Sequence, residues 1–176
     1  FEIGAGTGGT SAMVFQKLHA DGVGSPSHRN HVLQYCYTDI SKAFLMHAER
    51  EYRRHYPYLT CRLFDVEQPF ALQGLGSARY DLVIAANVLH ATKNIRHTLR
   101  NAKALLRPNG LLLLNELSTK SLFTHLTFGL LEGWWRYEDV ALRLPGCPVL
   151  DPAGWRWVLT EEGFRSVCFP AEQVHH

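Results

Sequence analysis

A glycine-rich segment near the start of the chain constrains the fold more than any other feature. Residues 4–9 read Gly-Ala-Gly-Thr-Gly-Gly, between the short apolar stretch 1–3 and a segment of helical periodicity. Glycines gathered in this way let another group approach the backbone closely, because a Cβ there would collide with it. A strand, a glycine loop and a helix in this order predict an α/β domain that holds a ligand at the loop.

The spacing of the glycines fits two kinds of cofactor site. Gly4, Gly6 and Gly9 match the GxGxxG pattern of dinucleotide-binding loops, whereas Gly4, Gly6 and Gly8 match the GxGxG pattern of methyltransferases. Glu2 precedes the loop and would place an anion near the ligand. That charge disfavours a pyrophosphate and favours S-adenosylmethionine, whose methionyl end carries an ammonium and a sulfonium. A glycine turn without a ligand is the remaining interpretation.

Strand-length apolar stretches alternate with longer segments of helical periodicity, which is typical of a parallel sheet with crossover helices. We expect strands at 1–3, 32–38, 60–64, 80–86, 111–115 and 164–169, and helices at 10–18, 94–107, 121–131 and 155–162. Residues 21–30 are hydrophilic and predict a surface connection. The predicted fold class is therefore α/β, a mostly parallel sheet with helices on both faces.

Polar side chains follow three of the predicted strands. Asp39 follows the second strand, where a carboxylate can accept both ribose hydroxyls of an adenosyl group. Asp65 follows the third strand and is expected to accept a hydrogen bond from the adenine amino group. Asn87 follows the fourth and is expected to contact the methionyl part of the cofactor or to orient a catalytic base. The alternative for each is a purely structural role in a turn or at a helix start.

Composition excludes several other classes of function. Eighteen Lys and Arg against 16 Asp and Glu give a net charge of +2, far from the basic surface of a nucleic-acid-binding protein. No apolar run approaches the roughly 20 residues that cross a bilayer. The four cysteines lie far apart without a CxxC pair, so we expect reduced thiols and a cytoplasmic protein. The histidines show no metal-ligand spacing, and no metal is predicted.

Five longer segments match the motifs of one enzyme family. They are EIGAGTGGT at 2–10, YTDIS at 37–41, YDLVIAANVLHAT at 80–92, LLRPNGLLLLNEL at 105–117 and FGLLEGWW at 128–135. Together they resemble the carbon-methyltransferase domain of type I polyketide synthases. The resemblance implies a Rossmann-like class I methyltransferase fold, S-adenosylmethionine as cofactor, and methylation of the α-carbon of a β-ketoacyl chain on an acyl carrier protein.

The resemblance also implies a catalytic pair. In that family a histidine after the fourth strand and a glutamate at the end of the fifth act together, and they correspond here to His90 and Glu116. Because imidazole exchanges protons near neutral pH, His90 is expected to remove the α-proton while Glu116 fixes its tautomer and stabilises the imidazolium. A helix-capping His90 and a solvated Glu116 are the alternatives.

The chain departs from the family at both ends. The family's amino-terminal lid, which precedes the glycine loop, is not within this sequence, and we expect the last antiparallel strand to be missing after Val174. The resemblance therefore does not transfer the choice of acyl substrate. Because the sequence starts within a strand and lacks an initiator methionine, we expect a fragment, residues 1–176, of a larger synthase with neighbouring domains. The final His175-His176 is either native or part of a tag.

Several interpretations stay open at this point. An O- or N-methyltransferase shares the cofactor motifs, a non-catalytic domain shares the fold, and a nicotinamide-dependent oxidoreductase is supported only by the alternative glycine spacing. Trp134 and Trp135 either wall an acyl tunnel or belong to the core. Arg50, Arg53 and Arg54 either meet an acidic carrier protein or form a solvated helix end.

Overall fold

The chain divides into two compact units in the computed structural model, which describes residues 1–20 and 34–170. The first unit comprises residues 1–89 and 101–116, and the second comprises residues 90–100 and those from 117 onward. Helix α3 (Ile95–Leu105) gives its first half to the second unit and its second half to the first. The predicted connection at 21–30, the predicted start of a strand at 32 and the final histidines lie outside the described residues.

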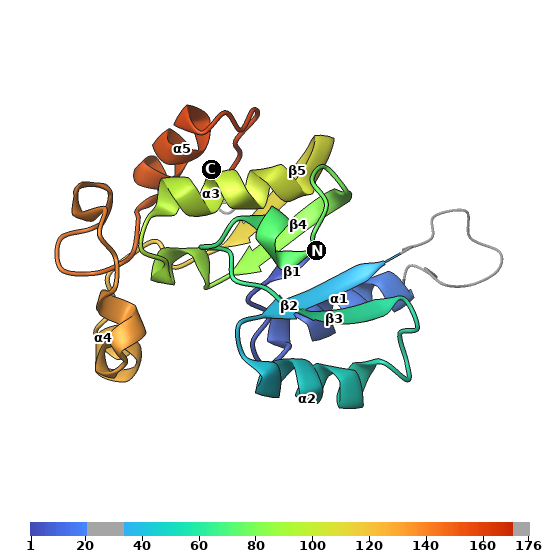
Figure 1. The fold of residues 1–176 in the computed structure, drawn as a ribbon. Helices are drawn as coiled ribbons and strands as arrows, with labels where there is room; N and C mark the ends of the chain where they lie inside the picture. The colour runs from blue at the N-terminus through green and yellow to red at the C-terminus, as the bar shows by residue number, and fades with distance from the viewer. Residues whose placement is uncertain (21–33, 171–176) are drawn as a thin grey trace. The chain divides into compact units, whose positions relative to one another are not determined.

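The first unit is built on a five-stranded sheet. Its strands are β1 (Glu2–Ile3), β2 (Tyr35–Asp39), β3 (Leu59–Leu63), β4 (Tyr80–Ala86) and β5 (Leu106–Asn115). All of them pair in parallel, in the order β3-β2-β1-β4-β5 (Figure 1), so the predicted α/β fold class is confirmed. The order reverses at β1, and such a switch point opens a crevice at the carboxyl ends of the two central strands.

Helices α1 (Gly9–Ala20) and α2 (Lys42–Tyr52) cover one face of this sheet (Figure 1). Phe15 from α1 and Ala48 from α2 are fully buried against Tyr35, Tyr37 and Leu59 of the sheet. Side chains alternate between the two faces of a strand, so the neighbours of these residues face the other way.

The opposite face of the sheet carries a second aromatic cluster. The ring of Phe1 packs against Phe64 and Tyr80 with centroid distances of 5.1 and 4.8 Å. The second half of α3 adds Asn101, whose Nδ2 donates to the carbonyl of Val66 at 2.9 Å. Apolar burial on both faces explains why β4 consists almost entirely of apolar residues.

The second unit is helical. It contains the first half of α3 together with α4 (Leu122–Thr127) and α5 (Pro152–Glu161). Short 3₁₀ helices are η1 (Phe70–Gln73) in the first unit, η2 (Leu89–Ala91) at the junction, and η3 (Phe128–Leu130), η4 (Glu132–Trp135) and η5 (Val140–Leu142) in the second. None of the described helices combines the length and apolarity that crossing a membrane requires.

Trp134 anchors the core of the second unit together with Cys147 and Val149, and Leu117 and Leu144 pack against them. Trp134 is therefore a core residue, which was one of the two interpretations of the tryptophan pair. Trp135 is about half exposed, and its Nε1 donates to the carbonyl of Gly129 at 2.8 Å.

The predicted strand at 164–169 is wrong. These residues form no strand, because Gly163 and Ser166 adopt positive φ angles of 77° and 56° that interrupt an extended chain. The carbonyl of Val167 instead accepts a hydrogen bond from Arg156 of α5 at 3.2 Å. The predicted helix at 121–131 is also shorter, because α4 ends at Thr127 and the chain tightens into η3.

Candidate active site

The glycine loop connects β1 to α1 at the switch point of the sheet. Gly4, Gly6 and Gly8 have φ angles of 59°, 60° and 84°, which residues with a Cβ rarely adopt. The loop is fixed beside β2, because the N–H of Ala5 donates to the carbonyl of Thr38 at 2.9 Å. This local geometry turns the chain directly from the strand into the helix.

The three glycines serve different needs. A Cβ on Gly4 would lie 2.4 Å from Cγ2 of Val88, and one on Gly8 would lie 2.9 Å from the ring of Tyr52. The protein's own packing therefore requires glycine at these two positions, and the close approach of a ligand expected from the sequence stays a prediction. A Cβ on Gly6 would meet no atom nearer than 4.0 Å, and one on Gly9 would meet none within 4 Å, so a ligand can approach the loop at these two positions.

Asp39 is brought directly to the glycine loop. Its side chain is buried, with Oδ2 accepting from the N–H of Gly6 at 2.9 Å and Oδ1 accepting from the N–H of Ser41 at 2.8 Å. Each carboxylate oxygen can accept two hydrogen bonds, so each retains an acceptor position after these contacts. Tyr37 supports the same loop by donating its hydroxyl to the carbonyl of Gly6 at 2.6 Å.

Glu2 lies inside the protein rather than beside an open loop. It is only 2% exposed, and its Oε2 accepts from the hydroxyls of Ser11 and Tyr35, the latter at 2.6 Å. Burial raises the pKa of Glu2, while the two hydroxyl donors oppose that rise. Burial and the neighbouring Glu2 carboxylate likewise raise the pKa of Tyr35. The predicted contact of Glu2 with a cationic ligand stays a prediction.

Asp65 and Asn87 occupy the strand ends that the sequence indicates. Asp65 follows β3, and its Oδ1 accepts from the N–H of Glu67 at 2.9 Å. The main chain of Asp65 is also paired in both directions with the amide of Gln73, at 2.7 and 2.8 Å. Asn87 follows β4 with a positive φ of 52°, and its N–H donates to the carbonyl of Asn115 at 2.8 Å.

Glu116 organises the turn after β4. Its Oε1 accepts from the N–H groups of Val88 and Leu89 at 3.0 and 2.9 Å. Charge-assisted bonds of this kind hold a carboxylate firmly, so Glu116 is not the freely solvated side chain of the alternative interpretation. The turn that it organises leads directly into His90.

His90 belongs to the second unit and is buried there. Its ring meets the ring of Trp134 edge to face, with the centroids 5.7 Å apart. Its carbonyl accepts from Nη1 of Arg143 at 3.0 Å. Because His90 and Glu116 fall in different units, their action as a pair stays a prediction.

Several residues that support the site have only weak sequence signals. Tyr37 and Tyr52 hold the carbonyls of Gly6 and Gly8, the latter at 3.4 Å, and Val88 packs on Gly4. Tyrosines in a buried strand and an amphipathic helix resemble ordinary core residues. Only their burial next to a glycine loop distinguishes them.

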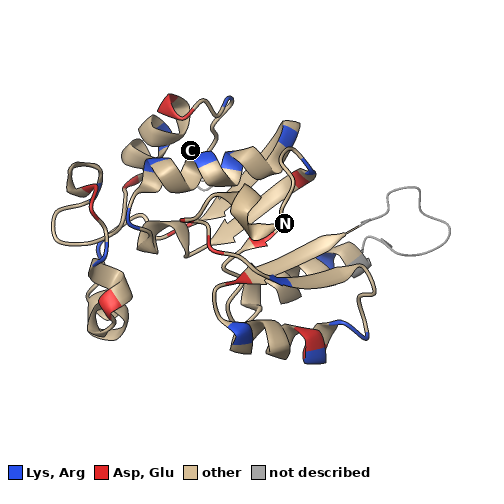
Figure 2. Ribbon diagram, viewed as in Figure 1, with Lys and Arg blue, Asp and Glu red and all other residues tan. Residues whose placement is uncertain are grey.

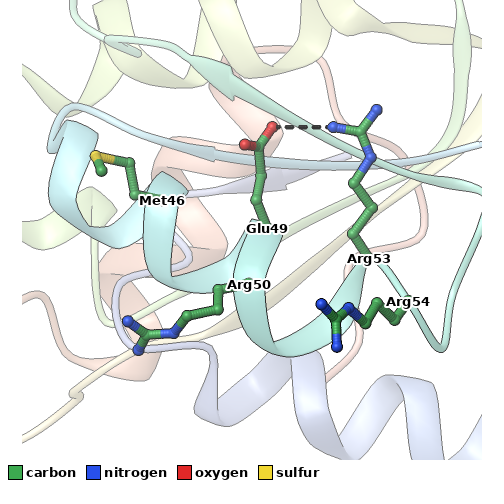
Figure 3. Close-up of a pocket in the computed structure, with 5 residues that line it drawn as sticks. All are labelled: Met46, Glu49, Arg50, Arg53 and Arg54. Carbon is green, nitrogen blue, oxygen red and sulfur yellow. Dashed lines mark hydrogen bonds and ion pairs between the residues drawn. The ribbon is translucent and has the colours of Figure 1, made fainter.

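An open hollow of about 500 Å³ lies along α2 and the residues that follow it (Figure 3). It is lined by Met46, Glu49, Arg50, Arg53 and Arg54. Arg53 pairs with Glu49 at 3.5 Å and Arg50 pairs with Glu51 at 2.9 Å, so basic and acidic residues alternate at this helix end (Figure 2). The described residues contain no group of three His, Cys, Asp or Glu that could hold a metal ion.

A parallel sheet with a switch point, a glycine loop and an acid after the second strand defines an α/β domain for a nucleotide-like cofactor. A family model described as a methyltransferase domain matches residues 1–112. The chain therefore belongs to the methyltransferase-domain family.

Comparison with individual proteins shows which kind of methyltransferase domain the chain resembles. The chain is 63% identical over 174 residues to the polyketide synthase PksR of Bacillus subtilis, covering 99% of this chain and 7% of that protein. It superimposes on the DszA carbon methyltransferase with a TM-score of 0.86 and 44% identity, over 95% of this chain and 41% of that one. For the trans-methyltransferase CalH in complex with SAH, the TM-score is 0.79 and the identity 38%, over 92% of this chain and 43% of that one. The predicted resemblance to polyketide synthase carbon-methyltransferase domains is confirmed.

Proposed function

We propose that the chain is an S-adenosylmethionine-dependent carbon methyltransferase domain of a polyketide synthase. Its substrate is a β-ketoacyl chain on an acyl carrier protein, and the methyl group goes to the α-carbon. The observation that carries the proposal is the likeness to the DszA carbon methyltransferase, at a TM-score of 0.86 and 44% identity, because cofactor motifs alone do not select the acceptor atom.

The first unit has features that suit an adenosyl cofactor. The space beside Gly6 is open, and a Cβ at this position would obstruct a ligand there. Asp39 lies next to Gly6 and retains acceptor positions for two ribose hydroxyls. Asp65 at the end of β3 is assigned to the adenine amino group. Asn87 and Glu2 are assigned to the methionyl end, with Gly4 and Gly8 giving the loop its shape.

Chemistry at the α-carbon requires a base as well as a cofactor. When bound, S-adenosylmethionine supplies an electrophilic methyl group, so that a carbon–carbon bond forms as the carbon–sulfur bond breaks. His90 accepts the α-proton at a ring nitrogen, which leaves the electron pair on the substrate carbon. Glu116 stabilises the resulting imidazolium, and its bonds to Val88 and Leu89 hold that carboxylate in place.

Mass spectrometry of a β-ketoacyl carrier protein incubated with cofactor and protein tests this function. We expect a methyl-mass gain that His90→Phe abolishes and Glu116→Gln lowers. His97→Phe is the matched control, because His97 is an exposed residue of α3 and its replacement should leave the rate unchanged.

Each outcome separates a different alternative. An unchanged rate in His90→Phe would remove His90 as the base. Calorimetric titration that detects no cofactor binding to the wild-type chain would favour a non-catalytic domain of the same fold. A methyl group found on oxygen or nitrogen would favour the O- or N-methyltransferase.

A further inference from the structure

A buried arginine holds the chain at His90 and has been given no role in the proposed reaction. The side chain of Arg143 is 0% exposed. Its Nε and Nη2 donate to the two carboxylate oxygens of Asp139 at 2.7 and 3.2 Å. Its Nη1 donates to the carbonyls of His90 and Pro148 at 3.0 and 2.7 Å, and its Nη2 donates to that of Thr92 at 3.1 Å. These contacts use all five N–H groups of the guanidinium.

Asp139 extends the same connection to α3. Its Oδ2 also accepts from the N–H of Ile95, the first residue of that helix, at 2.7 Å. The N–H of the neighbouring Glu138 donates to the carbonyl of Lys93 at 2.8 Å. Residues 90–95 are therefore fixed at three carbonyls and at the helix start by residues 138–143.

Stability alone is a weak explanation for this arrangement. Removing a guanidinium and a carboxylate from water costs several kcal/mol per ion, and well-packed apolar residues often stabilise a fold equally well. What the ion pair adds is geometric definition, because a planar guanidinium imposes directions on all of its acceptors. The carbonyl of His90 is held by Arg143 while its ring packs against Trp134, so both ends of the residue are constrained.

We propose that Arg143, together with Asp139, is a positioning residue for His90. The pair fixes the backbone from which the imidazole projects, and so aligns the base with the α-proton of the substrate. This inference rests on the proposed function, in which His90 is the base. A lysine at 143 would keep the charge but lose the planar set of five donors.

Steady-state kinetics of Arg143→Lys test the inference. We expect kcat for methylation of the β-ketoacyl carrier protein to fall roughly tenfold to a hundredfold, as for a catalytic group displaced by about 1 Å. The KM and the Kd for S-adenosylmethionine should not change, because the glycine loop belongs to the other unit. Arg100→Lys is the matched control, since Arg100 belongs to the same unit but its guanidinium pairs with Glu162, which lies outside residues 90–95.

A double-mutant cycle distinguishes positioning from general support. If Arg143 acts through His90, Arg143→Lys should not lower the residual rate of a His90→Ala variant, measured in long incubations at high protein concentration. An equal fold-loss in both backgrounds, or an unchanged kcat in the single variant, would overturn the inference. Asp139→Asn, which retains the size of the side chain, should follow the same pattern with a smaller loss.

A measurement without substrate separates this inference from the proposed function. In ¹H–¹⁵N spectra of the histidine rings, Arg143→Lys should shift the His90 resonances. The resonances of His125, whose ring packs on the same Trp134 at 5.7 Å, should not move. Unmoved His90 resonances, or equal shifts in both rings, would refute positioning even if the wild-type chain transferred no methyl group. His90 resonances that shift as expected in Arg143→Lys, together with a wild-type chain that transfers no methyl group, would refute only the proposed function.

Discussion

At the scale of single residues, Glu2 is a buried acid whose carboxylate would attract the cationic methionyl end of the proposed cofactor. Its carboxylate is 2% exposed and is bonded by Ser11 and Tyr35. Desolvation makes the ionised form costly, and the pKa of Glu2 is raised as a result. A ligand carrying an ammonium would offset part of this cost, which gives a reason to keep an acid at a position where an amide would fit.

Glu2→Gln is predicted to remove the pH dependence of stability that Glu2 contributes. With a raised native pKa, the folded state binds more protons than the unfolded state from the ordinary value of 4.5 up to the native pKa. Wild-type stability contributed by this group therefore falls as the pH rises through that window, and below it the group has no effect. Thermal unfolding from acidic to neutral pH should show the variant gaining stability relative to wild type.

Glu2→Gln should also bind S-adenosylmethionine more weakly than wild type, because the variant lacks the carboxylate charge. Calorimetric titration measures this affinity. Glu161→Gln, an exposed residue near the end of α5, is the control and should change neither quantity. A stability difference between Glu2→Gln and wild type that is constant with pH would contradict the argument from burial.

Alanine substitutions at Gly4 and Gly6 should separate folding from binding. Both positions have positive φ, which costs an alanine about 1 kcal/mol. Gly4→Ala would also place its Cβ only 2.4 Å from Cγ2 of Val88, so a total loss of about 3 kcal/mol is expected. Gly6→Ala should lose only about 1 kcal/mol of stability, from its positive φ, but most of its affinity for the cofactor. Denaturant unfolding and calorimetric titration measure both, and equal stability losses would contradict the assigned roles.

At the scale of elements, a buried carboxylate joins α3 to the end of α5 in the second unit. Glu162 accepts from Arg96 at 2.9 Å and from Arg100 at 2.6 and 3.0 Å. The bond from Arg100 is the main reason that the pKa of Glu162 is lowered. A lowered native pKa means that the stabilisation is present above the ordinary value of 4.5 and is lost as the pH falls through the native pKa.

Glu162→Gln should therefore destabilise the second unit by about 2 kcal/mol at neutral pH, a value typical of hydrogen bonds to charged groups. The difference from wild type should close as the pH falls below 4.5, because protonation removes the same charge from the wild-type side chain. Thermal unfolding monitored by tryptophan fluorescence at each pH measures the stability difference between the variant and wild type. A difference that persists at acid pH would contradict the ionic explanation.

The sequence predicts an element most accurately where a single physical requirement, such as burial, determines its residues. Strand β4 was predicted at Tyr80–Ala86 and lies there, because a strand buried on both faces requires an unbroken apolar run. Strand β5 was predicted to begin at Leu111 but begins at Leu106. Tyr80 pairs with Leu106 and Leu82 with Leu111, so the intervening residues form an irregularity within the strand. Their Pro-Asn-Gly sequence is equally typical of a turn.

The site was predictable to the extent that topology determines it. Parallel strands place their carboxyl ends at one edge, so Asp39 and Asn87 could be expected near a glycine loop. The link from Arg143 to His90 spans 53 residues, and no periodicity or local motif connects them. The packing roles of Gly4 and Gly8 were missed for the same reason, because the neighbouring Val88 and Tyr52 are distant in sequence.

At the scale of the whole molecule, the proposed chemistry is divided between two units. The glycine loop, Asp39 and Glu116 belong to the first unit, whereas His90 and Arg143 belong to the second. Cofactor binding should therefore survive substitutions at His90 or Arg143, and methyl transfer should not. The chain spans 7% of the Bacillus subtilis synthase PksR, so the carrier protein and neighbouring domains are proposed partners.

The most direct test of the central claim follows the transferred methyl group itself. The chain is incubated with S-adenosylmethionine carrying a ¹³C-labelled methyl group and with a β-ketoacyl carrier protein, and the released acyl chain is analysed by ¹³C NMR. The account predicts a labelled methyl group bonded to the α-carbon, and no label in the reaction with His90→Phe. A label on an oxygen or nitrogen atom, or α-carbon labelling that continues in His90→Phe, would contradict it.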